Sequence, residues 1–201
     1  MQKPGAVWMG ARKTLNRSEA IEQYVILRMR VEDLKRLDYL LKGLKYNRIT
    51  LPPDSPFSCG DLADTVRTCF FGWLATLTDR DGRAIYAFDC LLALFPTRRV
   101  EIIRAQLSLE ACHDVLQQFR NNVAFHSRSE IAAHIQARMR LRDEDVFLDL
   151  NSAISDFLHI MERLTQEELE ALPELAETLE RMRVSHHPAF KQVPAGPLQN
   201  S

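Results

Sequence analysis

Hydrophobic residues recur at helical spacing along most of the chain. From Asn16 to about Tyr46 the leucines and valines follow one another at steps of three, four or seven, and a similar pattern returns over 61–78 and 146–164. No segment alternates apolar and polar residues for long enough to form a sheet. We therefore predict an all-α fold, a single-domain, up-and-down bundle of six or seven helices joined by short connections.

Capping and turn residues predict where these helices begin and end. Asn16 with Glu19 forms a capping box, and the proline-rich stretch 47–60 predicts a loop. Residues 165–168 have the form of another capping box, which predicts a new helix that Pro173 interrupts or kinks. We expect three regions, namely an N-terminal arm over 1–15, a helical bundle domain over 16–184 and a flexible C-terminal tail over 185–201.

Composition narrows the class of protein. The chain has 201 residues, of which 46% are hydrophobic and 26% charged, and seven glycines, as expected of a globular helical protein. Its four cysteines are far apart and form no C-x-x-C pair, which indicates a reducing compartment. The longest apolar run, 84–95, is too short to cross a bilayer, and the N-terminus has no signal-peptide pattern. We expect a cytoplasmic protein with no membrane partner.

Charge is segregated along the chain, although the formal net charge is only −1. Residues 1–48 carry eleven Lys or Arg against five Asp or Glu, and residues 97–142 carry eight against four. Over 143–180 the balance reverses, with one arginine against twelve acidic residues. The pattern indicates either a basic face for a polyanion and an acidic face for a basic partner, or merely the solvated face of a surface helix.

The longest apolar stripe ends at a histidine. Its members follow at spacings of 3-4-3-4-3-4-3, which predicts one long helix: Ile102, Ala105, Leu109, Cys112, Leu116, Phe119, Val123 and His126. Directly afterwards, 127–130 has the form of a capping box, so a new helix should begin where the long one stops. His126 is therefore expected at a helix junction.

The residues at this junction suit a phosphate-containing substrate. Arginine presents a planar fork to phosphate oxygens, amides bind ribose or phosphate oxygens, and histidine transfers protons near neutral pH. Asn122 lies four residues before His126 and can orient its imidazole. Helix-start N–H groups beside Ser127, together with Arg128, would attract an anion, so we assign Asn122, Ser127 and Arg128 to substrate binding.

Arg120 and His126 do not share a face of one ideal helix. They are six residues apart, which means about 240° of rotation and roughly 9 Å of rise. To act on one phosphate they need either a break in the helix near Ser127 or a second copy of the site from another subunit.

The stretch Arg-Asn-Asn-Val-Ala-Phe-His, residues 120–126, resembles the R-x(4–6)-H motif of the HEPN superfamily, particularly its abortive-infection branch. That superfamily is all-helical and includes ribonuclease toxins. The resemblance implies that Arg120 and His126 are the catalytic pair, with Asn121 in support. It also implies a metal-independent endoribonuclease of a bacterial defence or toxin–antitoxin system, which acts on RNA as a homodimer and has a protein antitoxin or other protein partner.

The same residues also admit a structural interpretation. A histidine that ends an apolar stripe is commonly a packed core residue, and arginines near helix ends commonly cap carbonyl groups. The alternative function is therefore a non-catalytic helical module for dimerisation or protein interaction. We expect no cofactor and no metal site, because the histidines and cysteines lack ligand spacing, and the chain has no glycine-rich phosphate loop.

Overall fold

The computed structural model describes residues 15–78, 87–121, 131–141 and 144–191. All the regular structure in these residues is helical, which confirms the all-α bundle. The helices are α1 (Arg17–Lys45), α2 (Cys59–Leu77), α3 (Ala87–Leu94), α4 (Arg99–Ala111), α5 (His113–Phe119), α6 (Ile131–Arg140), α7 (Glu144–Ala171) and α8 (Leu175–Arg181), with short 3-10 turns at Pro96–Arg98 and Pro188–Phe190.

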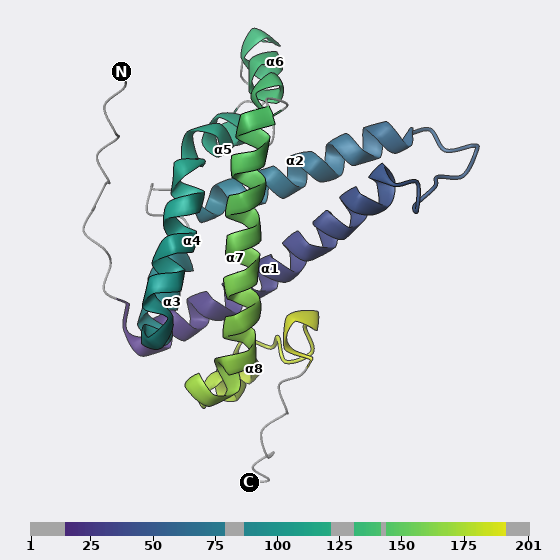
Figure 1. Cartoon of the computed structure of the whole chain (residues 1–201). Helices are drawn as coiled ribbons and strands as arrows, with labels where there is room; N and C mark the ends of the chain where they lie inside the picture. Colours follow the sequence, from purple (N-terminus) through teal and green to yellow (C-terminus); the bar gives the residue numbers. More distant parts are fainter. Residues whose placement is uncertain (1–14, 79–86, 122–130, 142–143, 192–201) are drawn as a thin grey trace, which may run out of the picture.

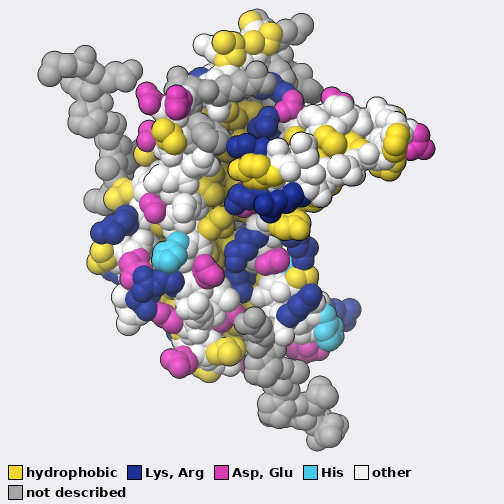
Figure 2. Space-filling model, turned by 45° about the vertical axis from the view of Figure 1, so that its right-hand side comes forward, with side chains coloured by type: hydrophobic (Ala, Val, Ile, Leu, Met, Phe, Trp, Pro, Cys, Tyr) yellow, Lys and Arg dark blue, Asp and Glu magenta, His cyan; other side chains and the backbone are white. Residues whose placement is uncertain are grey.

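The helices form a packed bundle from which one helical hairpin projects. α1 and α2 run antiparallel, and their connected ends extend away from the other helices (Figure 1). Figure 2 shows the same projection in space-filling form. α4 and α7 lie side by side in opposite directions, with α5 and α6 at one end of this pair and α8 at the other (Figure 1). We call this projection the α1–α2 hairpin; it consists of the C-terminal part of α1, the connection 46–58 and the N-terminal part of α2.

Local side-chain chemistry fixes the ends of α1. The predicted capping box is present, since Asn16 Oδ1 accepts from the Glu19 N–H at 2.9 Å and Glu19 Oε2 accepts from the Asn16 N–H at 3.1 Å. At the other end Asn47 has a φ of 53°, and the Arg48 N–H donates to the Gly43 carbonyl at 2.8 Å. These bonds satisfy carbonyl groups that the helix leaves open and turn the chain toward α2.

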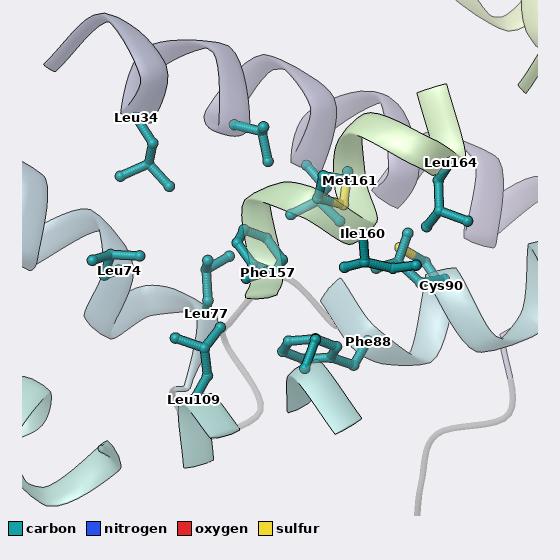
Figure 3. Packing of buried hydrophobic residues seen from close by; sticks show 14 of the residues in the cluster. Leu34, Leu74, Leu77, Phe88, Cys90, Leu109, Phe157, Ile160, Met161 and Leu164 are labelled. Carbon is teal, nitrogen blue, oxygen red and sulfur yellow. The ribbon is translucent and has the colours of Figure 1, made fainter. Parts of the chain in front are cut away.

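Apolar side chains from five helices meet in one core. Figure 3 shows Leu34 of α1, Leu74 of α2, Phe88 of α3, Leu109 of α4 and Phe157 of α7 directed into the same interior. The Phe88 and Phe157 rings pack edge to face with centroids 5.8 Å apart. The hydrophobic periodicity read from the sequence therefore corresponds to the buried faces of these helices.

Two predicted helix boundaries are wrong. The stripe that begins at Ile102 is buried as far as Phe119, but the helix that carries it is interrupted at Cys112, where α4 gives way to α5. Thr165 does not start a helix, since it lies inside α7 and its hydroxyl donates to the Met161 carbonyl at 2.7 Å. The threonine bonds back into its own helix, which is the alternative to capping. Pro173 does separate α7 from α8, as predicted.

The chain from residue 185 to residue 191 packs on the bundle, although the sequence placed it in the flexible tail. Ala189 and Phe190 are buried in the core. The Arg28 guanidinium, itself buried, donates to the Ala189 carbonyl at 2.8 Å and lies 5.6 Å from the centre of the Phe190 ring. Arg28 also donates to Glu168 at 3.1 Å. One buried cation thus joins α1, α7 and the C-terminal turn.

Candidate functional site

The motif of residues 120–126 begins at the C-terminal end of α5, where Arg120 and Asn121 continue the helical path as a π turn. α5 ends at Phe119, Arg120 keeps helical angles as its C-cap, and α6 begins at Ile131. Of the predicted site residues the structure describes Arg120, which is half-buried, and Asn121, which is exposed. Asn122, His126, Ser127 and Arg128 lie outside the described residues, as does the capping box predicted at 127–130.

Aromatic packing fixes the end of α5. Phe119 directly precedes Arg120 and is 3% exposed, with its ring 5.7 Å from the Phe71 ring of α2 in an edge-to-face arrangement. Phe71 in turn packs at 81° against Phe70. Since an aromatic pair of this kind restricts its backbone, the position of Arg120 is set by α2 as well as by α5.

Two neighbouring glutamines connect this helix end to the elements around it. Gln117 Oε1 accepts from Arg120 Nη1 at 3.4 Å, while Gln117 Nε2 donates to the Ala75 carbonyl of α2 at 2.9 Å. Gln118 Oε1 accepts from Arg140 Nη1 of α6 at 2.7 Å. Sequence reasoning missed both glutamines. Their position directly before the motif, on the side of α5 opposite its apolar stripe, is the feature of the sequence that could have identified them.

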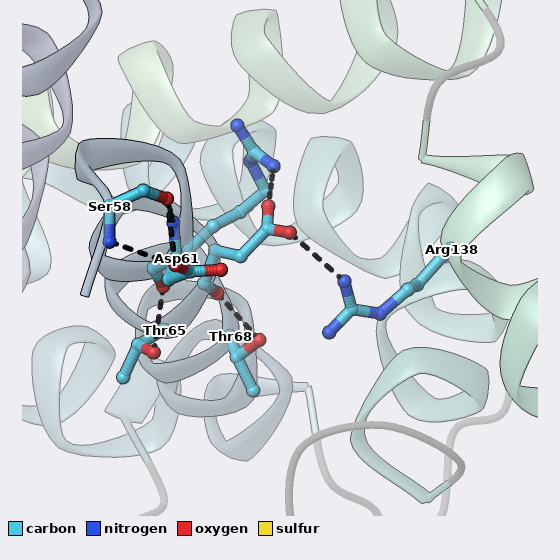
Figure 4. Close-up of polar contacts among 7 residues, drawn as sticks. Ser58, Asp61, Thr65, Thr68 and Arg138 are labelled. Carbon is cyan, nitrogen blue, oxygen red and sulfur yellow. Dashed lines mark hydrogen bonds and ion pairs between the residues drawn. The ribbon is translucent and has the colours of Figure 1, made fainter. Parts of the chain in front are cut away.

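The basic helix α6 is joined to α2 by an ion pair. Arg138 Nη1 lies 3.3 Å from the Asp64 carboxylate, which also pairs with Arg67 on its own helix (Figure 4). The Arg138 Nε atom is buried and has no hydrogen-bond partner among the described residues. Arg138 and Arg140 therefore bring positive charge from α6 to the end of α5 where the motif begins.

A groove of about 1140 Å³ opens between the α1–α2 hairpin and the helices α5, α6 and α7. Apolar side chains from α1, α2, α5 and α7 line it, including Leu41, Phe70, Phe119 and Ile154, while charged side chains such as Arg138 lie among them. Figure 2 shows apolar and basic side chains side by side where the hairpin meets the bundle. The residue before Arg120 thus contributes to the groove.

The arginines at the start of α4 do not belong to this site. Arg98 pairs with Glu167 of α7 and with Glu101, and it lies at the opposite end of α4 from α5 (Figure 1). α4 has 13 residues and is therefore about 20 Å long. Arg98 and Arg120 both come from the basic segment 97–142. Arg98, however, belongs to an ion-pair network that holds α4 on α7.

The buried cysteines are poor nucleophiles. Burial, followed by the charge of Asp149, raises the pKa of the Cys112 thiol, and burial likewise raises the pKa of Cys90. Because the thiolate is the reactive form, both residues are held in their unreactive state near neutral pH. All four cysteines are free thiols. Covalent chemistry at Cys112, next to α5, is therefore disfavoured.

Within the described ranges, no group of three or more His, Cys, Asp or Glu side chains could hold a metal ion. In the same part of the chain, none of the helices combines the length and the apolar character that a bilayer crossing needs. Comparison of the chain with family models, with curated proteins and with solved structures gives no match.

Proposed function

We propose that the chain is a HEPN-like, metal-independent endoribonuclease that acts as a homodimer in the cytoplasm, in a bacterial defence or toxin–antitoxin system. The observation that carries this proposal is the location of Arg120. It lies at the C-terminal end of α5. Gln117 accepts a hydrogen bond from it and also donates to the Ala75 carbonyl of α2, and the neighbouring Gln118 accepts from Arg140 of the basic helix α6. An arginine whose side chain is positioned by a hydrogen bond, with further cations close by, suits a phosphodiester substrate.

The residues assigned to the reaction have complementary roles. The oxygen of the ribose 2′-OH attacks the adjacent phosphorus. Either His126 takes the 2′-OH proton and water protonates the departing 5′ oxygen, or His126 protonates that oxygen and water takes the 2′-OH proton. The bond between phosphorus and that 5′ oxygen breaks, leaving a 2′,3′-cyclic phosphate and a 5′-hydroxyl. Arg120 stabilises the charge that grows on the phosphoryl oxygens, and Asn121 supports the pair. Asn122, Ser127 and Arg128 bind the substrate.

The test is cleavage of end-labelled single-stranded RNA in EDTA by wild type, His126→Ala and Arg120→Ala. Arg104→Ala is the matched control, because Arg104 is an exposed arginine on α4. Each variant is first checked by thermal unfolding followed by circular dichroism. We expect cleavage by wild type and Arg104→Ala, and a loss of about 100-fold or more in the two site variants. Equal cleavage by all four proteins, or none by any, contradicts the proposal.

The groove favours a second candidate, a non-catalytic helical module for dimerisation or protein interaction. Its apolar lining and charged side chains resemble the make-up of protein interfaces. In that case Arg120 and His126 hold the helix junction or the dimer interface. His126→Ala should then lower the melting temperature or dissociate the dimer. An unchanged melting curve together with an unchanged mass by light scattering contradicts this function.

A further inference from the structure

One face of α1 in the hairpin carries a stripe of alternating lysines and tyrosines, two of which, Lys42 and Tyr46, also line the groove. Its four members are spaced by 4, 3 and 4 residues and therefore lie on one side of the helix: Lys35, Tyr39, Lys42 and Tyr46. All four are exposed. Tyr39 has 73% of its surface exposed and Tyr46 has 59%. We call these residues the Lys–Tyr stripe.

The stripe is not part of the core. α1 packs on α2 and α3 through the other side of the helix, where Leu34 and Leu44 are buried. Two large aromatic rings directed into solvent contribute little to folding, since they remain exposed. An exposed aromatic ring with cations on its helical neighbours is, however, a suitable platform for a flat, anionic ligand.

The charge around the stripe is positive. Residues 35–48 contain five Lys or Arg and a single acidic residue, Asp38. Asp38 pairs with Lys42 at 2.6 Å, and Arg36 pairs with Glu32 at 3.7 Å and with Asp33 at 3.9 Å. After these pairs are counted, positive charge remains around the second tyrosine.

Two of these cations lie over that tyrosine. Lys45 Nζ is 5.5 Å and the Arg48 guanidinium 5.9 Å from the centre of the Tyr46 ring. The helix end described above places Arg48 there, because its N–H bonds back to Gly43. A base that stacks on Tyr46 would displace these side chains from the ring face that it covers, and the displaced cations would then lie close to its phosphates.

The spacing of the tyrosines matches a nucleic acid strand. Seven residues of helix separate the two tyrosines by about 10.5 Å along the axis. At about 3.4 Å per nucleotide of a stacked strand, this distance corresponds to roughly three nucleotides. An open, shallow hollow of about 420 Å³ lies beside Tyr39, with Glu32, Lys35, Arg36 and Leu40 in its lining, and offers space for a base next to the first ring.

We propose that the Lys–Tyr stripe binds single-stranded RNA, with bases stacked on Tyr39 and Tyr46 and phosphates held by the neighbouring lysines. This inference rests on the proposed function and deepens it, since it assigns a surface of the hairpin to binding the RNA. The stripe would hold a length of strand on the hairpin while Arg120 and His126 act elsewhere on the same molecule. The tyrosines are binding residues and do not touch the reacting phosphate.

Binding can be measured separately from cleavage. We would use the full-length His126→Ala protein in EDTA, with a fluorescein-labelled single-stranded RNA 12-mer and fluorescence anisotropy as the readout. Tyr39→Ala and Tyr46→Ala should each weaken binding by about five-fold or more, whereas Tyr39→Phe and Tyr46→Phe, which keep the ring, should restore it. Lys35→Gln combined with Lys45→Gln, which removes two lysines that, unlike Lys42, pair with no acidic side chain among the described residues, should lower the slope of log Kd against log salt by about 1.4. Val100→Ala, an exposed apolar site on α4, is the control and should bind like the parent.

Two results would overturn the inference, namely unchanged RNA binding by the two alanine variants, or a loss in the phenylalanine variants as large as in the alanine variants. The outcome is distinct from that of the catalytic proposal. A wild type that cleaves RNA but binds independently of the tyrosines contradicts the stripe alone. A protein that binds through the tyrosines but does not cleave contradicts the catalytic proposal alone.

Discussion

Replacing Arg28 by methionine should destabilise the protein far more than removing any exposed arginine. The Arg28 and Glu168 side chains are each only 5% exposed, and their charged groups bond to each other. The Tyr24 hydroxyl donates to the same Glu168 oxygen at 2.5 Å. Burial, reinforced by the Glu168 charge, raises the pKa of Tyr24, so this hydroxyl remains a donor at neutral pH. Arg28→Met removes the cation and leaves the carboxylate buried.

The expected magnitude follows from burial. Removing one partner of a buried ion pair costs about 3–5 kcal/mol, because the other charge stays without compensation. The matched control is Arg36→Met on the same helix, whose partner Glu32 lies 3.7 Å away and whose side chain is 49% exposed. Such an exposed pair contributes about 0–1 kcal/mol. In a chain of this size we expect a fall in melting temperature of about 6–20 °C for Arg28→Met.

Urea unfolding followed by circular dichroism measures both free energies of unfolding. A loss below about 1 kcal/mol for Arg28→Met, equal to that of Arg36→Met, would refute the reasoning. Arg28→Met combined with Glu168→Leu is a further check, because replacing both charges by apolar groups removes the unpaired carboxylate. We expect this double variant to regain half or more of the lost stability. A double variant less stable than Arg28→Met would contradict the account of an uncompensated charge.

Three other predictions concern local structure. Asn47→Ala should lower the free energy of unfolding by about 1 kcal/mol in urea unfolding, because its backbone is left-handed; Asn47→Gly should not. Arg98 lowers the pKa of Glu167, so the stability from this pair is present above pH 4.5 and is lost as the pH falls. Melting of Arg98→Gln and wild type should therefore converge in acid, and a constant difference counts against the pair. Asp64→Asn should lower hydrogen-exchange protection in α6 but not in α4, since Arg138 loses its partner. Protection of α6 equal to that in the wild type contradicts this.

Periodicity and capping predicted much of the fold because both act over a few residues. The capping box at Asn16 and Glu19 forms as predicted, and the stripe from Ile102 to Phe119 is buried along its described length. A stripe records which face is buried and not whether the backbone is continuous. It therefore could not show that the helix is interrupted at Cys112.

Contacts between residues far apart in the chain could not be predicted from the sequence. Arg28 occupies a helical position like any other arginine, and its partners Glu168 and Ala189 are 140 and 161 residues away. For the same reason the turn at Pro188–Phe190 was assigned to the tail. Its three residues have no helical periodicity, and they are held by the buried cation of another helix. Local propensity carries no information on such a pairing.

For the candidate site the sequence predicts both a location and a chemistry, and the chemistry remains a prediction. Arginine, amides and histidine in one short stretch predict phosphate chemistry. The sequence placed Arg120 inside a helix that continues to His126, whereas in the structure Arg120 is the C-cap of α5, and the nearby Gln118 bonds to Arg140 of α6. The bonds from Gln117 to Arg120 and to Ala75 depend on how α5 packs on α2, so the sequence could not place them. The roles of His126, Asn122, Ser127 and Arg128 remain predictions.

The most direct test of the account is whether cleavage needs the ribose 2′-OH. After the cleavage site in a single-stranded RNA is mapped, the nucleotide on its 5′ side is replaced by its 2′-deoxy form, and both substrates are incubated with wild type in EDTA. The account predicts a 2′,3′-cyclic phosphate product from the all-ribose RNA and no cleavage of the substituted RNA at that site, with equal binding of both by the His126→Ala protein. Equal cleavage of the two substrates, or no cleavage of the all-ribose RNA, would contradict it.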